Sequence, residues 1–121
     1  MTNRVQSLLV ELSEETGLSV DSQTRTLCGT NNGYAVCLGP VKRNLEFIPL
    51  SIALCRGGTI PDKEELRRFA ERMEPMLSCV TQRKRSSVSV RIRVSLSSAE
   101  RPVLQALEAT TAFLRERGYQ S

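Results

Sequence analysis

The stretch that decides the fold is residues 86–96, which read SSVSVRIRVSL. One set of alternate positions is aliphatic, namely Val88, Val90, Ile92, Val94 and Leu96. The other set is polar, namely Ser87, Ser89, Arg91, Arg93 and Ser95. Because successive side chains of a strand point to opposite faces, this pattern predicts a strand with one buried and one solvated face. A register shift of one residue would bury two arginines, so the register is well defined.

The composition fits one globular domain spanning residues 1–121. The chain is 40% hydrophobic and 25% charged, and its length suits a single core. It has no Trp and no His, and only 4% of its residues are aromatic, so the core must be built from Leu, Val, Ile and Met. The net charge of +4 favours acidic partners only weakly.

The N-terminal region predicts a helix rather than a signal peptide, because Glu11, Glu14 and Glu15 interrupt its apolar residues. The helix should span residues 3–17, with Gly17 ending it. Its apolar positions follow helical spacing and are Val5, Leu8, Leu9 and Leu12. No stretch approaches the roughly 20 apolar residues of a membrane span. We therefore expect a soluble, cytoplasmic protein without a membrane partner, whose cysteines are free thiols by default.

Residues 18–38 predict a hairpin, because Asn31-Asn32-Gly33 is a strong turn signal. With Asn32-Gly33 as a two-residue loop, Cys28 lies directly opposite Cys37. In that register the two cysteines form a non-hydrogen-bonded pair, with Cα atoms about 4.5 Å apart. A disulfide can form at this separation, which makes Cys28 and Cys37 a candidate redox pair. The alternative, which we favour for a cytoplasmic protein, is two reduced cysteines packed side by side.

Residues 45–55 predict a third strand that is apolar on both faces, which indicates burial on both sides. Pro49 lacks a backbone N–H and should therefore lie at a bulge, an edge or a strand start. A single layer of helices covers only one face of such a strand. A second subunit, a client protein or the first helix should cover the other. The predicted protein-binding residues on that outer face are Phe47, Pro49, Ser51 and Ala53.

Two further helices are predicted. The second runs from Pro61 or Asp62 to Cys79, and Pro75 should kink or end its last turn. Its predicted core positions are Leu66, Phe69, Ala70, Met73, Met76, Leu77 and Val80. The last begins at Ser98 and ends at Gly118. The element order α-β-β-β-α-β-α predicts an α+β fold, with an antiparallel sheet of about four strands and helices packed on it. A helical crossover would make the last strand parallel to the third.

This element order resembles type III secretion chaperones and related small bacterial α+β chaperone-like domains. The resemblance is carried by the first helix with Leu8, Leu9 and Leu12, by residues 61–66 (PDKEEL) at the start of the second helix, and by the closing helix. It departs from that family in charge, since the family tends to be acidic. The resemblance implies a homodimer that wraps an unfolded segment of a client protein. It implies no catalytic residue.

Enzymatic, cofactor and metal chemistry find little support in the residues. The absence of His excludes Ser-His and Cys-His nucleophiles, and no glycine-rich phosphate motif is present. The carboxylates fall mainly on exposed helix faces, so we predict neither an enzyme nor a cofactor. A zinc site would have to use Cys28, Cys37, Cys55 and Cys79, and these lack the close spacing of zinc ligands. We therefore predict no metal.

The remaining candidate is a basic patch formed by Arg83, Lys84, Arg85, Arg91 and Arg93, which could contact nucleic-acid phosphates. The simpler interpretation is a solvated sheet face kept soluble by arginine. The sequence thus favours a non-enzymatic protein-binding module, acting as a homodimer on a client protein. The alternative is a basic nucleic-acid-binding accessory protein.

Overall fold

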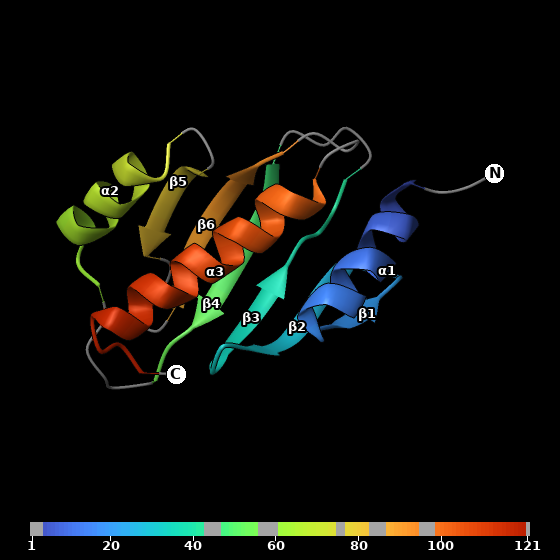
Figure 1. Cartoon of the computed structure of the whole chain (residues 1–121), viewed down its shortest axis with the longest axis horizontal. Helices are drawn as coiled ribbons and strands as arrows, with labels where there is room; N and C mark the ends of the chain where they lie inside the picture. Colours follow the sequence, from blue (N-terminus) through green and yellow to red (C-terminus); the bar gives the residue numbers. More distant parts are fainter. Residues whose placement is uncertain are drawn as a thin grey trace.

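The computed structural model describes residues 4–42, 47–55, 61–74, 77–82, 87–94 and 99–120. Its helices are α1 (Arg4–Thr16), α2 (Lys63–Arg72) and α3 (Glu100–Glu116). Its strands are β1 (Ser19–Asp21), β2 (Thr26–Asn31), β3 (Tyr34–Leu38), β4 (Phe47–Ala53), β5 (Leu77–Gln82) and β6 (Ser87–Arg93). These strands form one sheet in the order β1-β2-β3-β4-β6-β5, and every pairing is antiparallel (Figure 1). The predicted α+β fold is confirmed, with six strands rather than about four among the described residues.

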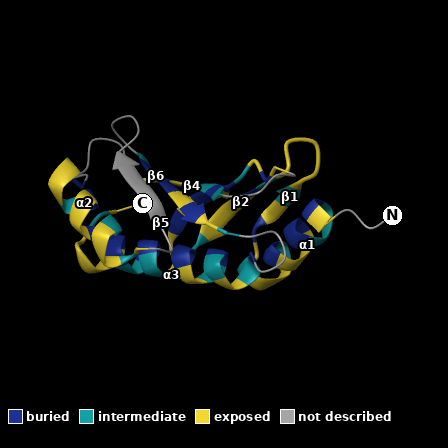
Figure 2. Ribbon diagram, turned by 90° about the horizontal axis from the view of Figure 1, so that it is seen from above, coloured by how far each residue is buried: buried dark blue, intermediate teal, exposed yellow. Residues whose placement is uncertain are grey.

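The helices lie on one side of the sheet. Helices α1 and α3 run along one face (Figure 2), and α2 lies beside β5 and stacks its Phe69 ring on Phe113 of α3. Between helices and sheet lies one core, to which α1 contributes the predicted Val5, Leu8, Leu9 and Leu12. Within the described residues, no helix has the length and apolar character needed to cross a bilayer.

Strand β6 behaves as its alternating pattern predicts. Val88, Val90 and Ile92 are buried against the helices, whereas Arg91 and Arg93 are exposed on the other face. The predicted direction of this strand is wrong, because β6 runs antiparallel to β4.

The hairpin confirms the register expected from its turn. Asn32 and Gly33 have φ values of 51° and 86°, the left-handed conformations that a type I′ turn requires. The two strands pair from Asn31 opposite Tyr34, and this pairing places Cys28 opposite Cys37.

The second helix is shorter than predicted. Helix α2 begins after Asp62, whose carboxylate accepts a hydrogen bond of 2.8 Å from the Glu65 N–H, and it ends at Arg72, ahead of Pro75. The next segment is strand β5, so the prediction of helix through Leu77 to Cys79 is wrong. Proline breaks the helix, and the segment beyond it can then pair with β6. This extra strand returns the chain across the sheet and makes β6 antiparallel to β4.

Pro49 lies inside a central strand rather than at a bulge or a sheet edge. Its carbonyl accepts a hydrogen bond from Gly39 N–H, one residue past the end of β3. In an antiparallel ladder, the N–H and C=O of one residue point toward the same neighbour. Pro49 therefore lacks its N–H on the side that faces Gly39, where the β3 ladder has already ended, and no ladder hydrogen bond is lost there.

The C-terminal segment ties the layers together. The Tyr34 hydroxyl donates to the Tyr119 carbonyl (2.5 Å), Cys55 N–H donates to the Gln120 carbonyl (2.8 Å), and the Tyr119 hydroxyl donates to Glu65. Burial raises the pKa of Tyr34, and burial together with the hydrogen bond to Glu65 raises the pKa of Tyr119 to about 12. Both phenols therefore stay neutral and serve as anchors.

Candidate binding face

The sheet face opposite the helices, which we call the open face, collects most of the residues singled out in the sequence. It consists of the outward residues Ser19, Asp21, Thr26, Cys28, Thr30, Ala35, Cys37, Phe47, Pro49, Ser51, Ala53, Ser87, Ser89, Arg91 and Arg93. Their alternate neighbours, such as Ile48, Leu50 and Ile52 on β4, are fully buried against the helices. The predicted protein-binding residues and the candidate redox pair thus share one face.

The centre of the open face is flat. One cross-strand row reads Ser19, Cys28, Cys37, Ser51, Ser89, and the adjacent row reads Thr30, Ala35, Ala53, Ser87. Each of these side chains is short, so the backbone of the sheet lies close to the surface. Another polypeptide could approach it closely.

Strand β4 is buried on one face only. Ser51 and Ala53 are exposed, and Phe47 and Pro49 are half-buried, so the prediction of burial on both faces is wrong within this chain. The first helix packs on the opposite side and does not cover these residues. Among the described residues the exposed large hydrophobic side chain is Val10 of α1, so the open face is less apolar than expected.

A basic corner, formed by Phe47, Arg91 and Arg93, lies at one end of the open face. Phe47 pairs with Arg93 across the β4–β6 ladder. The guanidinium carbons of Arg91 and Arg93 lie 5.1 and 5.6 Å from the centroid of the Phe47 ring, which is cation–π geometry. The structure therefore joins one predicted protein-binding residue to two residues of the predicted basic patch. The other three, Arg83, Lys84 and Arg85, lie outside the described residues.

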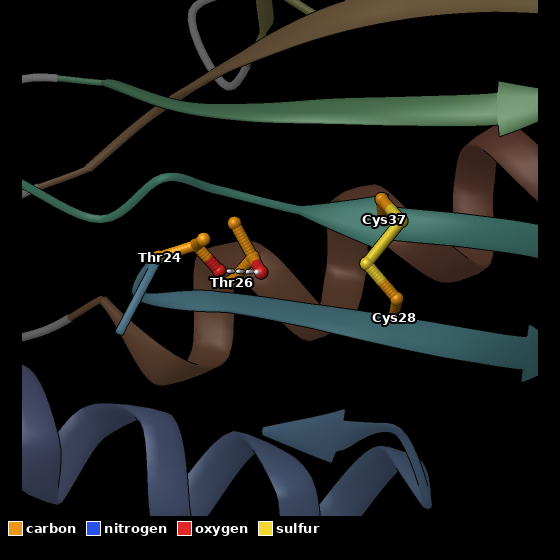
Figure 3. Close-up of a disulfide and its surroundings, with 4 residues drawn as sticks. All are labelled: Thr24, Thr26, Cys28 and Cys37. Carbon is orange, nitrogen blue, oxygen red and sulfur yellow. Dashed lines mark hydrogen bonds between the residues drawn. A yellow bond between two sulfur atoms is a disulfide. The ribbon is translucent and has the colours of Figure 1, made fainter. Parts of the chain in front are cut away.

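A disulfide joins Cys28 and Cys37 in the central row (Figure 3). Their Cα atoms are 4.2 Å apart, close to the separation expected from the hairpin register, and both residues are exposed. The sequence favoured two reduced thiols, whereas the structure contains the bridge. Cys55, two residues past the end of β4, is exposed and takes no part in this disulfide. In the described part of the chain, no three His, Cys, Asp or Glu residues gather as a metal site would require.

In the sequence, the basic patch, the outer face of the third strand and the cysteine pair stand as three separate sites. The signal that unites them is alternation, since the described members of each set occupy outward positions of their own strands. Pairing of β2, β3, β4 and β6 in one sheet brings these positions together. Comparison of the chain with protein-family models and with curated proteins found no match.

Proposed function

We propose that this protein is a non-enzymatic protein-binding module that holds a segment of a client protein against the open face. The observation that carries the proposal is the uncovered outer side of β4, where Ser51 and Ala53 are exposed in the middle of the sheet. A central strand with a solvated face is ordinary in an antiparallel sheet. A face this flat also offers a large area for close packing.

The chemistry of the open face suits reversible contact with a polypeptide. Interfaces combine an apolar centre with polar groups that keep their hydrogen bonds. Here Ala35 and Ala53 supply small apolar contacts, while Ser51 and Ser89 supply hydroxyl groups that can donate and accept. An extended segment lying across such a surface could meet both kinds of group without displacing any large side chain.

We further propose a homodimer in the cytoplasm, of the secretion-chaperone kind that the element order resembles. Strand β5 supports the dimer, since it pairs only with β6 among the described strands and lies at the edge of the sheet. An unpaired edge can add a strand from a second copy. Light scattering on the eluting protein should give twice the mass of the 13.5 kDa chain, and a monomeric mass at high concentration contradicts this part of the proposal.

The client-binding proposal can be tested with an array of short peptides balanced in charge and hydropathy, probed with labelled protein. We expect a subset of peptides to bind, and Ala53→Arg to lose that binding because the new side chain stands up from the flat face. The matched control is Gln105→Arg, which adds the same side chain at an exposed position of α3. Equal binding by the two variants, or no binding by the wild type, refutes the proposal.

A second candidate function is nucleic-acid binding, and the basic corner is the observation that favours it. An aromatic ring beside two guanidinium groups can stack with a base while pairing with phosphates. Titration with single-stranded RNA and DNA at low and moderate salt tests this candidate. Binding that weakens steeply with salt supports it, and no binding at low salt removes it.

A further inference from the structure

The charge on the open face is unevenly distributed. Between its two edges, the outward residues of β2, β3 and β4 carry no charge. Asp21 of β1 lies at one edge and Arg91 of β6 near the other. Four strand spacings separate them, which is about 19 Å, so Asp21 lies far outside ion-pair distance of Arg91. An extended segment crossing this face passes from a neutral surface onto two cations.

We infer that the open face selects client segments in which two carboxylates alternate, acidic–any–acidic, and that these carboxylates pair with Arg91 and Arg93. This inference rests on the proposed client binding and specifies which clients bind. Residues two apart in a strand are about 6.6 Å apart on the same face. An extended partner has the same repeat, so alternate carboxylates would match the spacing of the two guanidinium groups.

The Phe47 ring prepares both arginines for this role. A guanidinium packed over a ring is held in position by the stacking, while its N–H groups remain in its own plane. A carboxylate approaching in that plane can accept two parallel hydrogen bonds. Within the described residues, no carboxylate forms an ion pair with Arg93.

A polypeptide fits these observations better than a nucleic acid does. A single strand of nucleic acid carries a phosphate at every nucleotide and needs a continuous track of positive charge. Beyond the basic corner, the described rows contain only Ser, Thr, Ala, Cys and Pro until Asp21. In a peptide with small neutral residues next to its acidic pair, the carboxylates would meet the two arginines and the small residues would meet the uncharged rows.

Three labelled peptides of equal length test the inference by fluorescence anisotropy. They share a Ser- and Thr-rich sequence and differ only in whether, and where, they carry two Asp residues. The first carries two Asp residues in alternation, the second carries Asn at those positions, and the third carries the two Asp residues side by side. We expect the first to bind wild-type protein about tenfold more tightly than the second. We expect the third to fall between them, because adjacent residues of an extended chain face opposite ways.

The variants separate specific pairing from general charge. Arg93→Gln should remove the advantage of the alternating peptide, and Arg93→Lys should restore only part of it because lysine lacks the planar fork. Arg101→Gln removes an exposed arginine of α3 and should leave the advantage intact. Arg91→Gln serves in the same role if Arg93→Gln does not fold, as judged by circular dichroism.

Each outcome is decisive. Equal affinity for the Asp and Asn peptides overturns the acidic selection while leaving the proposed client binding in place. Loss of the advantage in Arg101→Gln also overturns it, because the effect is then one of net charge. If no peptide binds here and none binds on the array, both the inference and the proposed function are wrong. If single-stranded RNA binds in their place, the nucleic-acid function replaces them.

Discussion

The Cys28–Cys37 disulfide should contribute measurably to the free energy of unfolding. The bridge closes a loop with a sequence separation of 9 residues. In the chain-entropy description, cross-linking a loop of this length makes the unfolded state less favourable by about 2.6 kcal/mol at 25 °C. We therefore expect Cys28→Ala/Cys37→Ala to lower the free energy of unfolding by about 2–3 kcal/mol, a large share of the total for a small domain.

Urea denaturation followed by circular dichroism measures this difference. Five samples are needed, namely oxidised wild type, wild type with a dithiol reductant, the double variant without and with that reductant, and Cys55→Ala as the control. The reductant transfers two electrons and two protons to the bridge, giving two thiols, and is itself oxidised to a cyclic disulfide. Reduced wild type and the double variant should therefore shift to lower urea by similar amounts. The control replaces an exposed cysteine outside the disulfide and should match wild type.

Two results would refute this reasoning. If reductant leaves the wild-type transition unchanged while thiol counting shows that the bridge has opened, the hairpin is held by its turn and ladder alone. If reductant also destabilises the double variant, the effect does not come from this pair of cysteines. The entropic account predicts in addition that most of the change appears in the unfolded state, so the slope with urea should increase once the bridge is removed.

Three further predictions concern stability. Asp62→Ala removes the side-chain acceptor that caps α2 and should cost about 1 kcal/mol in urea denaturation, whereas Asp62→Asn should cost much less. Gly33→Ala should cost about 1–2 kcal/mol through backbone strain alone, because φ is 86° and no atom lies within 4 Å of an added Cβ. Burial and the hydrogen bond to Glu65 raise the pKa of Tyr119 from 10.0 to about 12 in the folded protein. The contribution of this phenol to the free energy of unfolding is therefore complete below pH 10 and is lost as the pH rises toward 12. Tyr119→Phe should flatten that decline, and an unchanged pH profile contradicts the assignment.

Much of the local structure could be predicted from the sequence because the signals were local. The alternation in β6 leaves one arrangement that buries aliphatic side chains and exposes Arg91 and Arg93. The Asn32-Gly33 turn determines its hairpin register by simple counting, and that count alone is enough to place Cys28 opposite Cys37. Apolar residues at helical spacing likewise located α1.

Strand β5 could not be predicted in the same way. Leu77 and Val80 are three residues apart, a spacing that also suits a helix, so a helical pattern can be extended from α2 through both residues. Pro75 ends the helix, but the structure of the segment after a proline depends on whether a pairing partner is available. That partner is β6, which lies later in the chain. The error then carried over to the direction of β6 relative to β4.

The candidate binding face likewise combines features that the sequence predicts with features that depend on strand pairing. Alternation placed Arg91 and Arg93 on the solvated side of β6, and Phe47, Pro49 and Ala53 together on one side of β4, because the period of two is a property of the extended backbone itself. Placing Phe47 beside Arg91 and Arg93 required the β4–β6 ladder and its register. Strand order depends on contacts between residues far apart in the chain, which no short sequence pattern encodes. The sequence by itself thus determined which side chains share a face of β4 and of β6, whereas only the tertiary structure decided that these faces are open and which of their residues meet.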